Sequence, residues 1–141
     1  MKNLYVFDKN KIIDKRKIHK FVKALTDGLN FSVIHLEINF VDSKQIHLLN
    51  KKHLNHDYTT DIITFDYSDN FESIDSEIFI SVDDAKTNSK KYKIRLIEEL
   101  ARLVIHGILH LLGYDDQITS DKKIMKQMEN KLLSSYKFIL L

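Results

Sequence analysis

Apolar and polar positions along this chain repeat with two different periods, and each change of period marks a new element. A short apolar run at 4–7 predicts an edge strand. Over 12–30 the apolar residues recur every three or four positions opposite lysines, which predicts an amphipathic helix. Alternation then returns at 31–40 and predicts a second strand. The inward face of the helix is expected to comprise Ile18, Phe21, Val22, Leu25 and Leu29.

The middle of the chain predicts a helix followed by two strands. Asp42 is placed to cap the helix, with Gln45 as its capping-box partner. The apolar runs at 61–66 and 77–82 predict strands, and the polar, acidic stretch 67–75 between them predicts a loop. Because the two strands are consecutive, we expect them to pair in antiparallel fashion.

Three more helices are predicted after these strands. The first is short and polar, begins at a cap formed by Asp83 or Asp84, and runs to Tyr92. The second, 96–112, is apolar on all sides in its second half, which is typical of a buried central helix. The third is expected to be capped by Thr119, Ser120 or Asp121 and to have an inward face of Ile124, Met128 and Leu132.

These elements sum to an α/β (α+β) fold with about four strands in one mixed sheet and helices packed on it. The 141 residues suit one core, and the chain has no prolines, repeats or low-complexity segments that would mark a boundary. We therefore expect one domain spanning 1–141.

The composition bears on two questions: in which compartment the protein lies, and which residue types can bind a metal. No apolar run approaches the length of a membrane span, and 1–8 lacks the basic-then-apolar layout of a secretion signal. We therefore expect a cytoplasmic protein with no membrane partner. The chain has no cysteine, so any bound metal must be held by histidine and carboxylate.

Charge is spread unevenly although the net charge is only +2. The first 25 residues carry eight lysines and arginines against two acids, while 57–84 carries nine acids and no lysine or arginine. Such runs are usually solvated faces. The alternative is that the basic face contacts a polyanion such as RNA.

The chemistry of the chain centres on the stretch 106–116. His106 and His110 are four positions apart, so on a helix their imidazoles lie on one face and can reach one ion. Gly113 can end that helix in a left-handed conformation, and the turn can bring Asp116 back under the histidines. Three protein ligands with an open fourth position are typical of a catalytic zinc site.

This ligand spacing also occurs in metzincin proteases. Here, however, Gly107 stands where those enzymes carry the glutamate that acts as general base. Both ring nitrogens of a histidine on a buried helix need a partner. A metal ion can be the partner of one nitrogen in each histidine; the alternative is that backbone carbonyls and water molecules are the partners.

Other polar residues near the motif are candidates for supporting roles. Glu99 lies on the same helix face as His106 and can orient a ligand or relay a proton, or else be a surface or paired carboxylate. Arg102, one turn before His106, can reach RNA phosphate or pair with a neighbouring glutamate. Asp115 is either a further ligand or a turn carboxylate, and Thr60 and Asp61 either line the cleft or cap a turn.

The motif resembles the YbeY family, whose signature H-G-x-L-H-L-x-G-Y-D-H is matched here by 106–116. An upstream family segment, L-N-x-x-x-R-x-x-D-x-x-T-D-V-L-S-F, is matched over 49–65, and an acidic residue followed by an apolar strand ending in serine is matched over 77–81. Two positions depart from the family. Asp116 replaces its third histidine ligand, and Leu54 replaces its arginine.

The resemblance implies a metal-dependent endoribonuclease specific for single-stranded RNA. It further implies a role in 16S rRNA 3′-end maturation and ribosome quality control, with rRNA and the small ribosomal subunit as partners. The metal would be one Zn²⁺ or another divalent ion such as manganese, bound by His106, His110 and Asp116. Glu99 and Arg102 are the candidate catalytic residues. The alternatives are a ribosome-associated RNA-binding factor with a structural metal and, less favoured, a metalloprotease.

Overall fold

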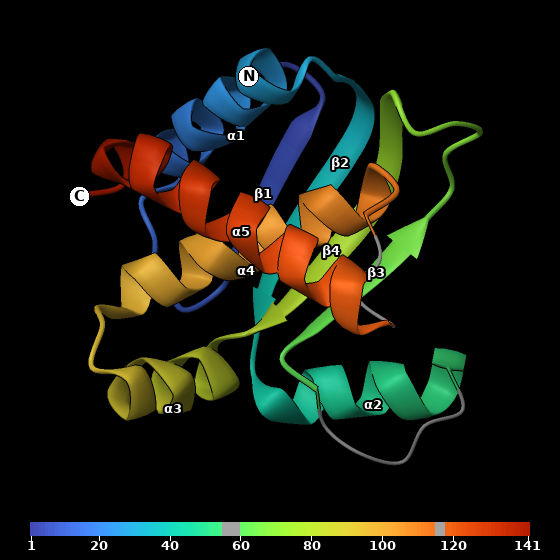
Figure 1. Cartoon of the computed structure of the whole chain (residues 1–141). Coiled ribbons are helices and arrows are strands. Elements are labelled where there is room, and N and C mark those ends of the chain that lie inside the picture. The colour runs from blue at the N-terminus through green and yellow to red at the C-terminus, as the bar shows by residue number, and fades with distance from the viewer. Residues whose placement is uncertain (55–59, 115–117) are drawn as a thin grey trace.

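The fold is built on one four-stranded mixed sheet (Figure 1). A computed structural model describes residues 1–54, 60–114 and 118–141, without the side chains of residues 53 and 54. In chain order, the elements are β1 (Leu4–Asp8), α1 (Lys15–Leu29), β2 (Ser32–Val41), α2 (Ser43–Leu54), β3 (Ile62–Asp66), β4 (Ser73–Ser81), α3 (Val82–Tyr92), α4 (Leu96–Leu111), α5 (Thr119–Tyr136) and a final 3-10 turn (Lys137–Ile139).

The strands lie in the order β1-β2-β4-β3. Strands β1, β2 and β4 run parallel, and β3 pairs with β4 in the antiparallel sense. The predicted antiparallel pairing of these two consecutive strands is therefore confirmed. The mixed α/β class expected from the sequence is confirmed as well.

Strand β4 begins earlier than the sequence predicts. It starts at Ser73, inside the stretch 67–75 that was expected to be loop. The reason is that Ser73 and Ile74 pair with Ser32 and Val33 of β2, and Ile74 is buried in the core while its polar neighbours are not. Pairing with β2 thus extends the strand into residues whose composition is typical of a loop.

Helix α4 lies between the sheet and α5 (Figure 1). It packs against β4 and β3 on one side and against α5 on the other. Ten of its residues are buried, most of them apolar, as expected of a central helix. Because α4 is packed on two sides, its position is well defined, and so is the position of the residues at its C-terminal end.

Helix α4 ends in the way that the sequence predicts. Gly113 has φ +99°, outside the region open to most residues. The N–H of Gly113 donates to the carbonyl of His110, and the N–H of Tyr114 donates to that of Leu109. This is the Schellman pattern, which turns the chain sharply after the helix.

Helix α5 has a different buried face from the one predicted. Met125, Glu129 and Leu132 are buried, whereas Ile124 is 51% exposed and that part of the prediction is wrong. The difference arises because α5 turns Glu129 toward charged partners on α4. A carboxylate with such partners can occupy a buried position that pattern reasoning assigns to an apolar residue.

Several caps differ from those predicted, and others agree. Helix α3 is capped by the side chain of Ser81 rather than by Asp83 or Asp84, and α5 starts after Ile118 with no side-chain cap. Asp42 does accept the N–H of Gln45, as expected for α2. The predicted inward face of α1 is confirmed for Ile18, Phe21, Val22 and Leu25, which are all buried, while Leu29 is partly buried against the core.

Candidate active site

The two histidines of the motif lie one turn apart near the end of α4. Together with Gly107 they line a pocket of about 130 Å³ whose far wall is Ile62 and Thr64 of β3. His110 is exposed, whereas His106 is half-buried. The helix thus presents both imidazoles to one small, solvent-accessible space, as the four-residue spacing predicts.

The donor set at this pocket fits a divalent metal. Two imidazoles on one helical face are a common part of zinc sites. Among the residues that the structure describes, no group of three metal-ligating side chains is found. Asp116, the expected third ligand, and Asp115 lie outside the described residues, so a three-ligand zinc site stays a prediction.

Gly107 lets α4 approach the sheet closely at this pocket. A Cβ atom on Gly107 would lie 3.1 Å from Cδ1 of Ile62 and 3.1 Å from Cδ1 of Ile78. Such a distance is tighter than ordinary carbon contacts, so a larger residue would require the two isoleucine side chains to shift. The close approach is what brings Thr64 of β3 beside the histidine pair.

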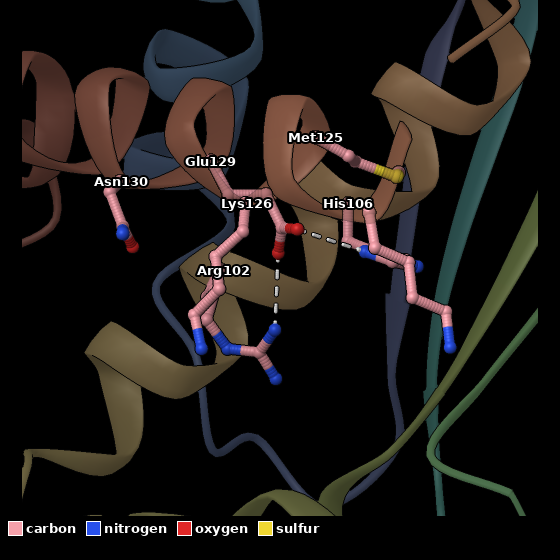
Figure 2. A pocket seen from close by; sticks show the side chains of 7 residues that line it. Arg102, His106, Met125, Lys126, Glu129 and Asn130 are labelled. Carbon is pink, nitrogen blue, oxygen red and sulfur yellow. Dashed lines mark hydrogen bonds and ion pairs between the residues drawn. The ribbon is translucent and has the colours of Figure 1, made fainter. Parts of the chain in front are cut away.

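A carboxylate from α5 contacts His106 (Figure 2). Glu129 Oε2 lies 3.2 Å from His106 Nδ1, and Glu129 Oε1 accepts a hydrogen bond of 3.1 Å from Arg102 Nη1. The Glu129 side chain is only 7% exposed. One carboxylate therefore ties together two residues of α4 that lie one helical turn apart.

Arg102 connects this carboxylate to a second one. Its Nε and Nη2 donate to the two oxygens of Glu99 at 2.8 and 2.7 Å, in a forked arrangement. The Glu99 side chain is fully buried and also lies 3.5 Å from Asn88 Nδ2 of α3. Hydrogen bonding to Glu99 raises the pKa of the Arg102 guanidinium above its usual value.

The structure places the two predicted catalytic residues behind the histidines rather than between them. Glu99 contacts Arg102, which contacts Glu129, and Glu129 in turn contacts His106. The paired state of Arg102, one of the two possibilities that the sequence left open, is observed. Their roles as reacting groups stay predictions.

Asp61 lies within electrostatic reach of the same group. Burial raises the pKa of its carboxyl above the usual value, while the charges of Arg102 and His106 act in the opposite direction. Its backbone carbonyl accepts the N–H of Ser81, which joins the start of β3 to the end of β4. Asp61 therefore lies near the site but is not among the residues that line its pockets, so a role in the cleft stays a prediction.

A second pocket opens between α4 and α5 on the other side of His106. Its volume is about 210 Å³, and Figure 2 shows the side chains of α5 that border it. Two exposed lysines contribute positive charge to this pocket. The lining residues are Arg102, His106, Lys122, Met125, Lys126, Glu129 and Asn130.

Sequence reasoning missed two of the residues at this site. Glu129 carries the one signal that could have revealed it, because a glutamate between Met125 and Leu132 interrupts a buried apolar stripe. Thr64 carries no such signal, since a threonine in a strand is unremarkable in sequence. Its place at the pocket follows from the pairing of β3 with β4.

Comparison with known proteins identifies the family. The model of the endoribonuclease YbeY family matches residues 5–137. The chain belongs to the YbeY family. The family resemblance drawn from 106–116 is thereby confirmed, and so is the expectation of a nuclease-type enzyme at the level of the family.

Individual members of the YbeY family match over most of their length. Endoribonuclease YbeY of Azobacteroides pseudotrichonymphae is 39% identical over 121 residues, covering 86% of each chain. The protein of the same name from Bacteroides fragilis is 38% identical over 125 residues, covering 89% of each chain. That from Cytophaga hutchinsonii is 36% identical over 124 residues, covering 88% of this chain and 87% of its own.

One solved structure shows the same fold. The solution structure of TM1509 from Thermotoga maritima superposes with a TM-score of 0.65 at 23% sequence identity. The match covers 92% of this chain and 86% of the TM1509 chain.

None of the helices in the described part of the chain is long and apolar enough to span a bilayer.

Proposed function

We propose that this chain is a metal-dependent endoribonuclease that cleaves single-stranded RNA, with 16S rRNA 3′-end maturation and ribosome quality control as its cytoplasmic role. The observation that carries the proposal is the pair His106 and His110 on one face of a buried helix, opening into a pocket beside β3. The printed names of the relatives, all endoribonuclease YbeY, support the reaction class.

Different residues at the site would bind the metal and the phosphate in the proposed reaction. His106 and His110, with Asp116 as the expected third ligand, would hold one Zn²⁺ ion or a comparable divalent ion. When bound, such an ion supplies Lewis-acid stabilisation of phosphate and lowers the pKa of a water molecule. Thr64 places a hydroxyl at the wall of the same pocket, where it can hydrogen-bond to a phosphate oxygen.

Positive charge beside the histidines supports an anionic substrate. Lys122 and Lys126 line the pocket between α4 and α5, which shares His106 with the first pocket. A phosphodiester backbone that crosses His106 would therefore meet lysines on its α5 side. Since Leu54 stands where the family carries an arginine, we propose that these lysines meet part of the phosphate charge.

The first test measures metal content and RNA cleavage together. We expect purified wild-type protein to bind one zinc or similar ion and to cleave an unstructured RNA oligonucleotide. His110→Ala is expected to lose both the metal and the cleavage, because it removes a ligand rather than a surface group. His35→Ala is the matched control, since His35 pairs with Glu37 on β2, away from the pocket.

The outcomes separate the proposed enzyme from its rivals. RNA cleavage by a rigorously metal-free preparation would refute the mechanism. RNA binding without cleavage, retained after metal removal, would instead favour a ribosome-associated binding factor with a structural metal. Metal loss in His106→Ala but not in Asp116→Ala would move the third ligand to another residue.

A further inference from the structure

The buried carboxylate of Glu129 is the group on α5 that the proposed reaction does not yet use. Its two oxygens have different partners. Oε1 accepts from Arg102 Nη1 at 3.1 Å, and Oε2 lies 3.2 Å from His106 Nδ1. Because the first contact holds one oxygen against a guanidinium, the second oxygen is directed at the imidazole (Figure 2).

The chemistry of the contact determines which nitrogen of His106 carries the proton. An ionised carboxylate can only accept hydrogen bonds, so Nδ1 must be the donor. In a neutral imidazole with hydrogen on Nδ1, the lone pair lies on Nε2. The contact therefore selects the tautomer in which Nε2 is the nitrogen that can bind a metal, and it increases the basicity of that nitrogen.

Glu129 is itself held in place by an ion pair between Arg102 and Glu99. Arg102 uses Nε and Nη2 on Glu99 and Nη1 on Glu129, so each of its three nitrogens contacts a carboxylate. Glu99 is fully buried and is bordered by Asn88 of α3. The two carboxylates and one guanidinium carry a combined charge of about −1, which favours a cation beside His106.

We propose that Glu129 is the positioning residue of His106, fixing its tautomer and ring orientation for metal binding, and that Glu99 and Arg102 hold Glu129 in place. The proposal rests on the proposed function only in taking His106 as a metal ligand. It gives Glu99 and Arg102 a supporting role that does not require either of them to touch the RNA.

A purely structural role for Glu129 makes different predictions. If the carboxylate merely joined α5 to α4, its loss would lower the stability of the protein without changing the His106 tautomer or the intrinsic affinity for metal. The test therefore measures stability, tautomer and zinc affinity separately on the full-length protein.

The experiment compares Glu129→Gln and Glu129→Ala with the wild type. Nitrogen NMR of the metal-free protein, above the pH range in which histidine titrates, reports which ring nitrogen carries hydrogen. Competition with a chelator of known affinity reports zinc binding. The matched control is Glu98→Gln, because Glu98 is a neighbouring α4 carboxylate whose contact is Lys137 rather than a histidine.

We expect hydrogen on His106 Nδ1 in the wild type and loss of that preference in Glu129→Ala. Zinc affinity should fall about 10- to 100-fold in Glu129→Ala, as is usual when the partner of a ligating histidine is removed. Glu129→Gln should lose less, since its amide oxygen can still accept from Nδ1. Glu98→Gln should retain the wild-type tautomer and affinity.

Two results would overturn the proposal. One is hydrogen on Nε2 of His106 in the wild-type protein, a measurement that needs no variant to fold. The other is a folded Glu129→Ala protein whose tautomer and zinc affinity equal those of the wild type. Neither readout uses RNA, so a failure of cleavage in the wild type would count against the proposed function alone.

Discussion

At the scale of single residues, Arg102 has the clearest structural role. It is 31% exposed, yet each nitrogen of its guanidinium contacts a carboxylate that is almost fully buried. Removing one member of a buried ion group leaves the others without compensation, which costs more than the group contributes as a whole. Arg102 is therefore expected to contribute to the stability of the fold by compensating the charges of Glu99 and Glu129.

We therefore predict that Arg102→Leu destabilises the metal-free protein by about 3 kcal/mol. Urea unfolding monitored by circular dichroism measures this change. The comparison is Arg95→Leu, because Arg95 is exposed at the start of α4. Unchanged stability in Arg102→Leu together with lost RNA binding would show that Arg102 serves the RNA rather than the fold.

Gly107 gives a second residue-scale prediction. A methyl group there would press on the tips of Ile62 and Ile78, so Gly107→Ala should destabilise the protein by about 1–3 kcal/mol despite the better helix propensity of alanine. Thermal unfolding of Gly107→Ala beside Gly107→Ala/Ile62→Val tests this, since the shortened side chain makes room. A stabilised Gly107→Ala protein would refute the close packing of α4 on β3.

Residue-level chemistry was predictable from sequence where spacing alone decides it. His106 and His110 share a helical face wherever the helix lies, so their pocket follows from the four-residue interval. The contact of Glu129 with His106 was not predictable, because the two residues are 23 positions apart and the contact depends on how α5 crosses α4. A buried glutamate is recognisable only when the arginine and histidine opposite it are known.

At the scale of elements, the end of α4 controls where the chain goes next. The Schellman turn at Gly113 has a positive φ, and the Phe71 ring lies 3.3 Å from the position that a Cβ would occupy. This turn leads into the segment that contains Asp116, the expected third ligand. The geometry of the turn is therefore expected to matter for metal binding as well as for stability.

We predict that Gly113→Ala lowers the free energy of unfolding by about 1 kcal/mol. It should also weaken zinc binding, because an alanine resists the left-handed conformation and shifts the following residues. Chelator competition and thermal unfolding of the same sample measure both effects. If zinc affinity is unchanged while stability falls, the third ligand does not depend on this turn.

Helices and strands were predictable where one of their faces is apolar. The residues at which they begin and end were harder to predict. The core face of α1 could be read directly because its apolar residues recur on one side of the helix, and that side is buried. The start of β4 could not, because Ser73 joins the strand through pairing with β2 rather than through its own composition. The face of α5 was shifted by one residue because a charged side chain occupies the buried stripe.

At the scale of the whole molecule, β3, α4 and α5 bring several charges together around His106. Asp61 comes from the start of β3, and burial raises its pKa although Arg102 and His106 lower it. A carboxyl with a raised pKa in the folded state stabilises the fold below its unfolded pKa, and this contribution is lost as pH rises through the folded value.

We accordingly predict that Asp61→Asn raises the melting temperature of the metal-free protein at neutral pH. This gain should shrink as pH falls through the raised pKa of the folded state and vanish below the ordinary aspartate range, where both proteins are uncharged at this position. Asp69→Asn is the control, because Asp69 is exposed in the β3–β4 loop. An equal gain at all pH values would contradict the electrostatic explanation.

The distribution of basic side chains gives a further whole-molecule prediction. Lys122→Glu/Lys126→Glu should weaken RNA binding and reduce the salt dependence by about 0.7 in log–log slope per lost phosphate contact. The matched change on α1, Lys15→Glu/Lys20→Glu, alters charge equally but lies outside the pocket lining. If only the α1 variant weakens binding, the RNA runs along α1 instead.

The overall architecture was predictable because its signals are local and redundant. Strand and helix periods, glycine at the end of α4 and the motif at 106–116 all indicate the same fold class. The order β1-β2-β4-β3 was not predictable in this way, since the crossover from β2 to β4 places β3 at an edge that no local pattern specifies.

The contact between Glu129 and His106 also has a consequence for incomplete synthesis. A chain broken off before residue 119 would carry both histidines, because α4 ends at Leu111, but not the carboxylate that α5 supplies. Prematurely terminated products would then lack the side chain that we propose positions His106 for metal binding. Dependence on the last helix would restrict nuclease activity to finished molecules and spare the cell from fragments that cut RNA.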